Sequence, residues 1–166
     1  MPALGVALLS GAGGASAAER FDHKGSLGLL VTGGGGYKDS FGPVFDSGAR
    51  VPVTLGGSLA VGYSGNELVL NALGAFAGPH PDWGASFGYR SYFGDERVKT
   101  FVSLEAAAHV APYFSIGPRV SLGVQYELTS TLGVLGGITA DLGAGAGFRF
   151  SAEGFLGLQL RTYVLE

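Results

Sequence analysis

The chain has 166 residues, a formal net charge of −3 and no cysteine, with 46% hydrophobic and 14% charged residues. This composition excludes a disordered chain, a strongly basic nucleic-acid-binding domain, disulfides, thiolate catalysis and cysteine-ligated zinc. Glycine is abundant, at 31 residues, well above the usual ~7%, but it does not recur at every third position as collagen requires.

The chain begins with a segment typical of export. A short apolar stretch at 4–9 is followed by small residues that end in an Ala-Ser-Ala-Ala run. We expect residues 1–18 to be a signal peptide cleaved near Ala17 or Ala18, or else a flexible leader. No apolar stretch reaches the ~20 residues of a membrane helix, so any membrane crossing has to use strands.

From residue 25 onward, apolar side chains alternate with small or polar ones, which is the period of a half-buried strand. The alternation predicts eight strands within one domain, 25–166. In chain order, the apolar positions lie within 27–31, 51–63, 68–76, 83–89, 98–110, 120–128, 132–142 and 156–164, and the seventh segment is expected to continue to Phe148 and Phe150.

Turn signals separate these segments. Short ones follow the second, fourth and sixth segments, at 64–66, 94–96 and 129–131. Gly78–Asp82 follows the third segment, and longer connections are expected at Lys38–Ala49, at Pro112–Pro118 and around Ser151–Gly154. This order predicts an all-β, eight-stranded, antiparallel up-and-down transmembrane barrel with tight periplasmic turns and longer outer loops.

The two faces of the segments differ in charge. The apolar face carries no Asp, Glu, Lys, Arg or His, and Arg50 lies at one edge. Because Arg or Lys on the lipid side of a barrel costs ~2–4 kcal/mol at mid-membrane, we expect this face to meet lipid. The other face, rich in Gly, Ser, Thr and Ala, suits a narrow interior. It carries the predicted interior charge network, in which positive and negative groups can pair: Glu67, Arg90, Lys99, Glu105, Arg119, Glu127, Asp141 and Arg161.

Aromatic residues collect at the segment ends, as expected for belts at the two membrane interfaces. One rim is expected to hold Tyr37, Phe76, Trp83, Tyr113, Phe114, Phe148 and Phe150, and the other Tyr63, Phe93, Tyr126 and Tyr163.

The pattern of 25–166 resembles the small eight-stranded outer-membrane barrels, the class of the transmembrane domain of outer-membrane protein A and of outer-membrane protein X. The resemblance implies location in the bacterial outer membrane, contact with outer-membrane lipid, an interior filled by side chains and no enzymatic activity. It also implies a structural or surface-interaction role through the outer loops, where Phe41 and Phe45 are candidate contacts for an extracellular partner. The class usually ends in an aromatic residue, whereas this sequence ends in Leu165-Glu166.

Two other functions stay open. Residues 84–88 match the G-x-S-x-G motif of serine hydrolases, although that motif needs a strand-turn-helix setting. A hairpin about 94–98 would place Ser86 opposite Glu105 and His109 near Asp82, so an outer-membrane hydrolase using Ser86 and His109 is one alternative. A soluble periplasmic barrel that binds a small apolar ligand is the other.

No cofactor, metal or nucleic acid is expected. His23, His80 and His109 are too scattered for a metal site. The glycine runs at 33–36 and 143–147 lack the following helix that a phosphate-binding loop needs.

Overall fold

The computed structural model describes residues 25–43, 45–61, 65–94 and 97–165, and their regular secondary structure is entirely strand. No helix in these ranges is long and apolar enough to cross a membrane. The strands are β1 (Gly25–Phe41), β2 (Gly48–Val61), β3 (Asn66–Phe76), β4 (Asp82–Phe93), β5 (Val98–Ala111), β6 (Ser115–Glu127), β7 (Leu132–Gly145) and β8 (Phe148–Leu165).

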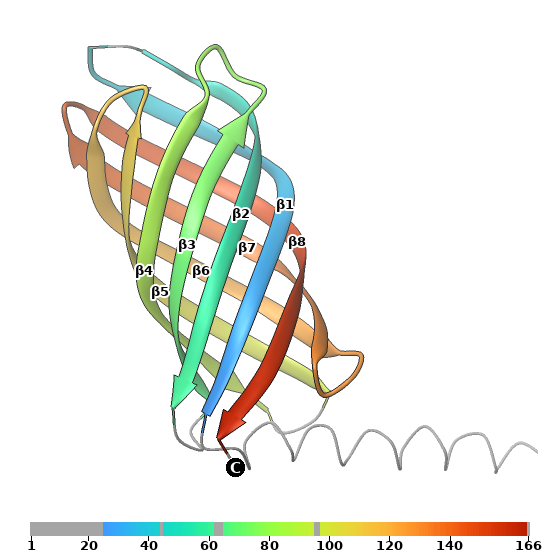
Figure 1. Cartoon of the computed structure of the whole chain (residues 1–166). Coiled ribbons are helices and arrows are strands. Elements are labelled where there is room, and N and C mark those ends of the chain that lie inside the picture. The colour runs from blue at the N-terminus through green and yellow to red at the C-terminus, as the bar shows by residue number, and fades with distance from the viewer. Residues whose placement is uncertain (1–24, 44, 62–64, 95–96, 166) are drawn as a thin grey trace, which may run out of the picture.

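Each strand pairs with the next, and β8 pairs with β1, so the sheet closes into an antiparallel barrel (Figure 1). The predicted fold class is thereby confirmed. The start of β1 and the end of β8 lie at one end, here named the terminal end. The opposite end, named the distal end, carries the connections 42–47, 77–81, 112–114 and 146–147.

The register fixes the tilt of the strands. Leu27 of β1 is paired with Leu59 of β2. If each paired residue is followed to its own partner on the next strand, from β2 through β8, the path comes back to β1 at Tyr37 and not at Leu27. Because one circuit climbs from Leu27 to Tyr37, the strands lie oblique to the barrel axis, as closure of a small barrel requires. Side chains far apart in sequence therefore meet at one height inside.

Alternation along each strand separates the two faces, as the sequence predicts. On β1, Leu29 is 65% exposed, whereas the adjacent Leu30 is only 5% exposed. The inward face nevertheless carries several large apolar side chains, although the sequence predicts mainly small and polar residues there. Leu30, Tyr92, Phe101 and Leu135 form a buried cluster inside the barrel, with Phe155 packed against it.

The connections differ from expectation. At the distal end, 42–47 and 77–81 are only slightly longer than the four-residue connections 62–65, 94–97 and 128–131 of the terminal end, and 112–114 and 146–147 are shorter, because the strands continue into the predicted loops. β1 runs on to Phe41, β2 starts at Gly48, and β6 starts at Ser115. Exposed apolar and buried polar residues still alternate there, so the ladder continues where turn-forming residue types suggested a loop.

The start of the last strand is a second correction. Phe148 and Phe150 belong to β8 and not to the seventh segment, and the predicted turn at Ser151–Gly154 lies within β8. Ser151 is buried in the interior, paired with Asp141 of β7. A polar residue that faces the inside of a barrel looks like a turn residue when only its type is considered. The true turn is Ala146-Gly147.

Candidate functional site

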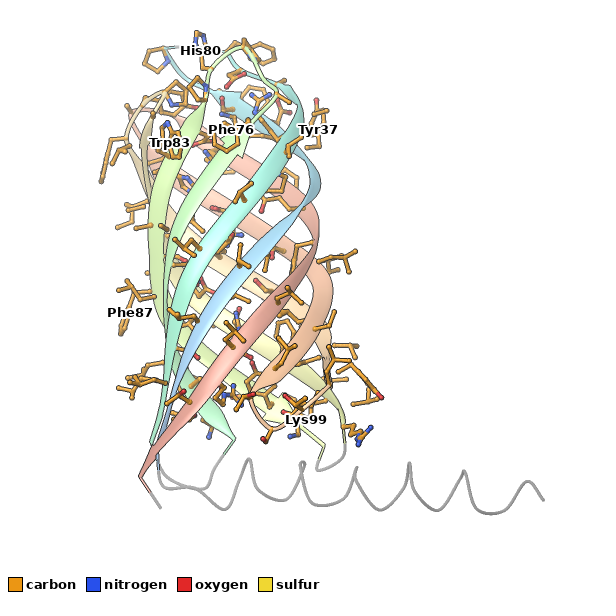
Figure 2. The ribbon with its side chains drawn as sticks, turned by 45° about the vertical axis from the view of Figure 1, so that its right-hand side comes forward. Tyr37, Phe76, His80, Trp83, Phe87 and Lys99 are labelled. Carbon is orange, nitrogen blue, oxygen red and sulfur yellow. The ribbon has the colours of Figure 1, made fainter. Side chains whose placement is uncertain are left out.

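The outer wall is an apolar surface. Its exposed side chains include Leu29, Leu55, Leu70, Leu104, Leu122, Ile138, Leu156 and Leu160, which come from all parts of the sheet. Figure 2 shows Phe87 projecting outward from the middle of this wall. An apolar patch on this scale is far larger than monomeric water-soluble proteins expose.

Aromatic side chains border this wall at both ends. Tyr37, Phe76 and Trp83 are exposed near the distal end (Figure 2), and Phe76 meets Trp83 edge to face at 5.2 Å between ring centroids. Phe93 and Tyr126 are exposed near the terminal end. Tyr63 and the side chain of Tyr163, which were expected at that rim, lie outside the described part of the chain.

All eight residues of the predicted interior charge network are buried. Near the terminal end, Nζ of Lys99 lies 3.0 Å from Oε1 of Glu127. Arg161 of β8 pairs across the interior with Glu67 of β3. Tyr92 also donates a hydrogen bond to Glu67, at 3.4 Å. These groups balance one another in charge within the barrel.

At mid-height, Arg119 contacts two carboxylates, Asp141 at 3.5 Å and Glu153 at 3.1 Å. Glu153 was not among the predicted network, because its position within 151–154 suggested a turn. Glu105 has different neighbours: it accepts hydrogen bonds from Ser86 at 2.5 Å and Asn71 at 2.9 Å.

A further cluster at the distal end is absent from the sequence prediction. Asp46, in the 42–47 connection, is buried, with its carboxylate 2.8 Å from Nζ of Lys38 and 2.5 Å from Nη2 of Arg50. Burial alone raises the pKa of Asp46, but hydrogen bonds from Lys38 and Arg50 outweigh it and hold the pKa below its ordinary 3.8. The 42–47 connection is thus drawn into the mouth of the barrel by its own side chain.

Asp82 joins this cluster to the groups below it. Its carboxylate lies 3.2 Å from Nζ of Lys38 and also pairs with Arg149. His109 lies between two carboxylates, with Nδ1 3.5 Å from Asp82 and Nε2 2.8 Å from Asp141. An unbroken series of contacts between charged side chains and the His109 imidazole therefore runs from the distal mouth to mid-height. Of its members, the sequence predicted Arg119 and Asp141 for the interior, Arg50 for a segment edge and His109 beside Asp82, whereas Lys38, Asp46 and Arg149 were not predicted to join them.

The residues of the hydrolase alternative are not brought together. Ser86 is paired with Ala107, not with Glu105 as expected, although its hydroxyl still reaches the Glu105 carboxylate diagonally. His109 does lie near Asp82, as predicted. Within the described ranges, however, the hydrogen bonds of Ser86 go to Asn71 and Glu105 and none goes to His109. Both Ser86 and His109 are buried, away from lipid and from solvent.

The interior holds little free space. One interior cavity measures about 30 Å³, and two others measure about 10 Å³ each. No group of three or more metal-ligating side chains is found among the described residues.

The candidate contact residues at the distal end are open to the surroundings. Phe41 is 51% and Phe45 is 69% exposed, and their rings meet edge to face at 5.8 Å. The four distal connections contain no Lys or Arg. The cations nearest to them, Lys38, Arg50 and Arg149, are all buried and paired with aspartates.

Comparison with known proteins gives no match in sequence and clear matches in fold. No protein-family model matches the chain, and no curated protein does. Neisserial surface protein A is similar at a TM-score of 0.59 and 14% identity, with 80% of this chain and 96% of that chain covered.

Two more solved structures agree. The N-terminal β-barrel domain of Pseudomonas aeruginosa OprF is similar at a TM-score of 0.52 and 13% identity, with 82% of this chain and 97% of that one covered. Ail, the attachment invasion locus protein of Yersinia pestis, solved with the heparin analogue sucrose octasulfate, matches at a TM-score of 0.52 and 8% identity, covering 82% and 99%. The chain has the fold of the small eight-stranded outer-membrane β-barrels.

Proposed function

We propose that this chain is an integral barrel protein of the bacterial outer membrane that presents its distal end to the outside. The single observation that carries the proposal is the orientation of the side chains: leucines and valines point outward while Lys, Arg, Asp and Glu are enclosed. In water this arrangement is unfavourable on both faces, whereas in a bilayer the outer wall needs no polar group.

The filled interior supports a role other than solute passage. Eight strands leave an interior just wide enough for side chains, and the interior cavity beside Arg90 and Arg119 measures only about 30 Å³. The same packing argues against the soluble alternative, because a barrel that carried a small apolar ligand would need an apolar cavity of several hundred Å³.

A test of membrane residence is refolding into detergent micelles and into phospholipid vesicles. We expect a band whose mobility on SDS gels changes on boiling, and protection of the barrel from added protease by the vesicles. Vesicles that contain the protein should not swell in isotonic glucose. A protein that stays folded and monomeric in detergent-free buffer would contradict the proposal.

We further propose that the distal end makes contacts through uncharged aromatic surface. Phe41 lies beyond Tyr37 along β1, and at ~3.3 Å per residue and a tilt of ~35–45° it stands about 10 Å further out than that belt residue. Phe41, whose ring meets that of Phe45 at 5.8 Å, therefore lies further from the middle of the barrel than Tyr37. Sucrose octasulfate, a polyanion, is a ligand of Ail. Here the distal connections offer no Lys or Arg to a polyanion.

Whole cells that display the protein can test this surface. Cells with the native chain should partition into hexadecane more than cells with Phe41→Ser/Phe45→Ser, while neither should be retained by heparin-agarose. Tyr126→Ser, at the terminal end, is the matched control and should behave as the native chain does. Retention on heparin, or equal partition of all three, would argue against an aromatic contact surface.

A further inference from the structure

Arg90 differs from the other buried cations of the barrel. Lys38, Arg50, Lys99, Arg119, Arg149 and Arg161 each lie within 4 Å of a carboxylate oxygen. Arg90 is only 4% exposed, yet no carboxylate of the described residues lies that close. Its Nε and Nη1 are buried with no hydrogen-bond acceptor in the same part of the chain.

The Phe101 ring offsets only part of this charge. The guanidinium carbon of Arg90 lies 4.9 Å from the ring centroid of Phe101, which is within the range of a cation–π contact. The ring face does not accept a hydrogen bond from Nε or Nη1 of Arg90, whose N–H groups point along the guanidinium plane. A buried guanidinium needs a negative partner and hydrogen-bond acceptors to offset the loss of water.

Arg90 borders one of the interior cavities. This space of about 30 Å³ is also bordered by Thr32, Thr54, Arg119 and Ser121. Cavities of this size accommodate one or two water-sized particles. The guanidinium and hydroxyl groups around it are hydrogen-bond donors.

Two carboxylates also border the cavity, but both already have donors. Glu153 pairs with Arg119 at 3.1 Å. Glu105 accepts from Asn71 and Ser86 through Oε2 and from Ser103, at 2.9 Å, through Oε1. The wall of the cavity therefore has donors to spare at Arg90, while its two carboxylates already accept hydrogen bonds and Oδ1 of Asn71 is a buried acceptor without a donor among the described residues.

We propose that this cavity is a binding site for one small monovalent anion of the size of chloride, held by Arg90 together with the surrounding hydroxyl groups. A water molecule would satisfy the hydrogen bonds of Arg90 but would leave the guanidinium without an anion in direct contact, since Glu105 shares the cavity wall without lying within 4 Å of it. The site is independent of the proposed cell-surface role and is testable in detergent micelles.

Crystals grown in bromide give a direct test. We expect an anomalous peak next to Arg90 in the native protein and no such peak in Arg90→Gln. Glu105 is the carboxylate on the cavity wall whose hydrogen bonds come from neutral groups, so its charge repels an anion and Glu105→Gln should increase the occupancy. Density that is not anomalous, or a side-chain contact between Arg90 and Glu105 that fills the cavity, overturns the proposal in favour of water or of a direct ion pair.

Thermal unfolding in solution gives a second test that does not depend on crystals. At constant ionic strength, replacing gluconate by chloride at ~10 times the dissociation constant should raise the native unfolding midpoint by about 3–6 °C. Arg149→Lys, which keeps a buried charge outside this cavity, should show the same rise. Arg90→Gln should show none, and Glu105→Gln should show a larger rise, which keeps the test valid if Arg90→Gln does not refold. Equal responses of all four proteins overturn the site.

Discussion

Nζ of Lys38 lies 2.8 Å from Oδ2 of Asp46, so a strand residue inside the barrel holds a residue of the 42–47 connection. Arg50 approaches the same carboxylate from β2 at 2.5 Å. The connection is thereby fastened to both strands that it joins, and the buried Asp46 side chain lies between them. The contacts below it, through Asp82 and His109, continue toward the middle of the lumen.

Asp46→Asn should loosen the distal mouth. Because the folded-state pKa of Asp46 is lowered, its charge contributes stability at every pH above its ordinary value of 3.8, and that contribution is lost as the pH falls below it. We expect Asp46→Asn to unfold at lower urea than the native protein at pH 7. The difference should shrink as the pH is lowered from 5 to 3. A difference that stays constant over this range would assign the effect to packing and not to charge.

Charge on the outer wall should block insertion. Leu55→Arg and Leu122→Arg place a guanidinium on exposed apolar positions, where the cost is ~2–4 kcal/mol at mid-membrane. The fraction that folds in vesicles, read from the gel shift on boiling, should fall sharply for both. Ser58→Ala changes an inward residue whose hydroxyl accepts one hydrogen bond, from Gln159 at 3.3 Å, and should insert normally. Equal insertion of the three variants would mean that the outer wall does not meet hydrocarbon.

The Lys99–Glu127 pair should be more costly to break than to remove. Both side chains are buried, so Lys99→Met removes the ammonium that lies 3.0 Å from the Glu127 carboxylate and should lower the free energy of unfolding by up to about 3–5 kcal/mol. Lys99→Met/Glu127→Leu removes both charges and should recover most of that loss. Urea titration in micelles measures both values. A double variant less stable than the single one would show that the pair itself contributes more than its desolvation costs.

Two glycines on opposite faces should respond differently to one methyl group. A Cβ on Gly137 would overlap the carbonyl oxygen of Leu122 on β6, whereas a Cβ on Gly35 would meet nothing within 4 Å. We expect Gly137→Ala to destabilise the barrel by about 1–3 kcal/mol, as overpacking does, and Gly35→Ala to leave the unfolding midpoint within about 1 °C of the native value. Comparable losses at both sites would point to backbone freedom and not to close approach of β6 and β7.

The side-chain period predicted the strands and their faces, while the contacts inside the barrel could not be predicted. Because side chains alternate along a strand, Leu122 and Arg119, three positions apart on β6, are predicted to lie on opposite faces. The diagonal contact of Ser86 with Glu105 depends on the register of β4 against β5, which a shift of two residues changes without exposing any apolar side chain. Such a shift leaves no trace in hydropathy.

Interior residues were also the ones most easily misassigned. Ser151 and Glu153 looked like turn residues because polar types near glycine usually are. Phe101 and Leu135 show the opposite effect: they face inward although their hydrophobicity matches the outer wall. Hydropathy cannot separate these cases, because the inside of the barrel accepts any side chain whose partners complete the packing. Only the closed sheet supplies those partners.

The exposed aromatic rings and enclosed cations of the distal end set how any attachment through Phe41 and Phe45 depends on the medium. Coulombic adhesion weakens as dissolved ions accumulate, whereas burial of apolar rings does not weaken with them and is strengthened by salts such as sulfate. Attachment of a bacterium through this end would therefore be as strong at high ionic strength as at low ionic strength.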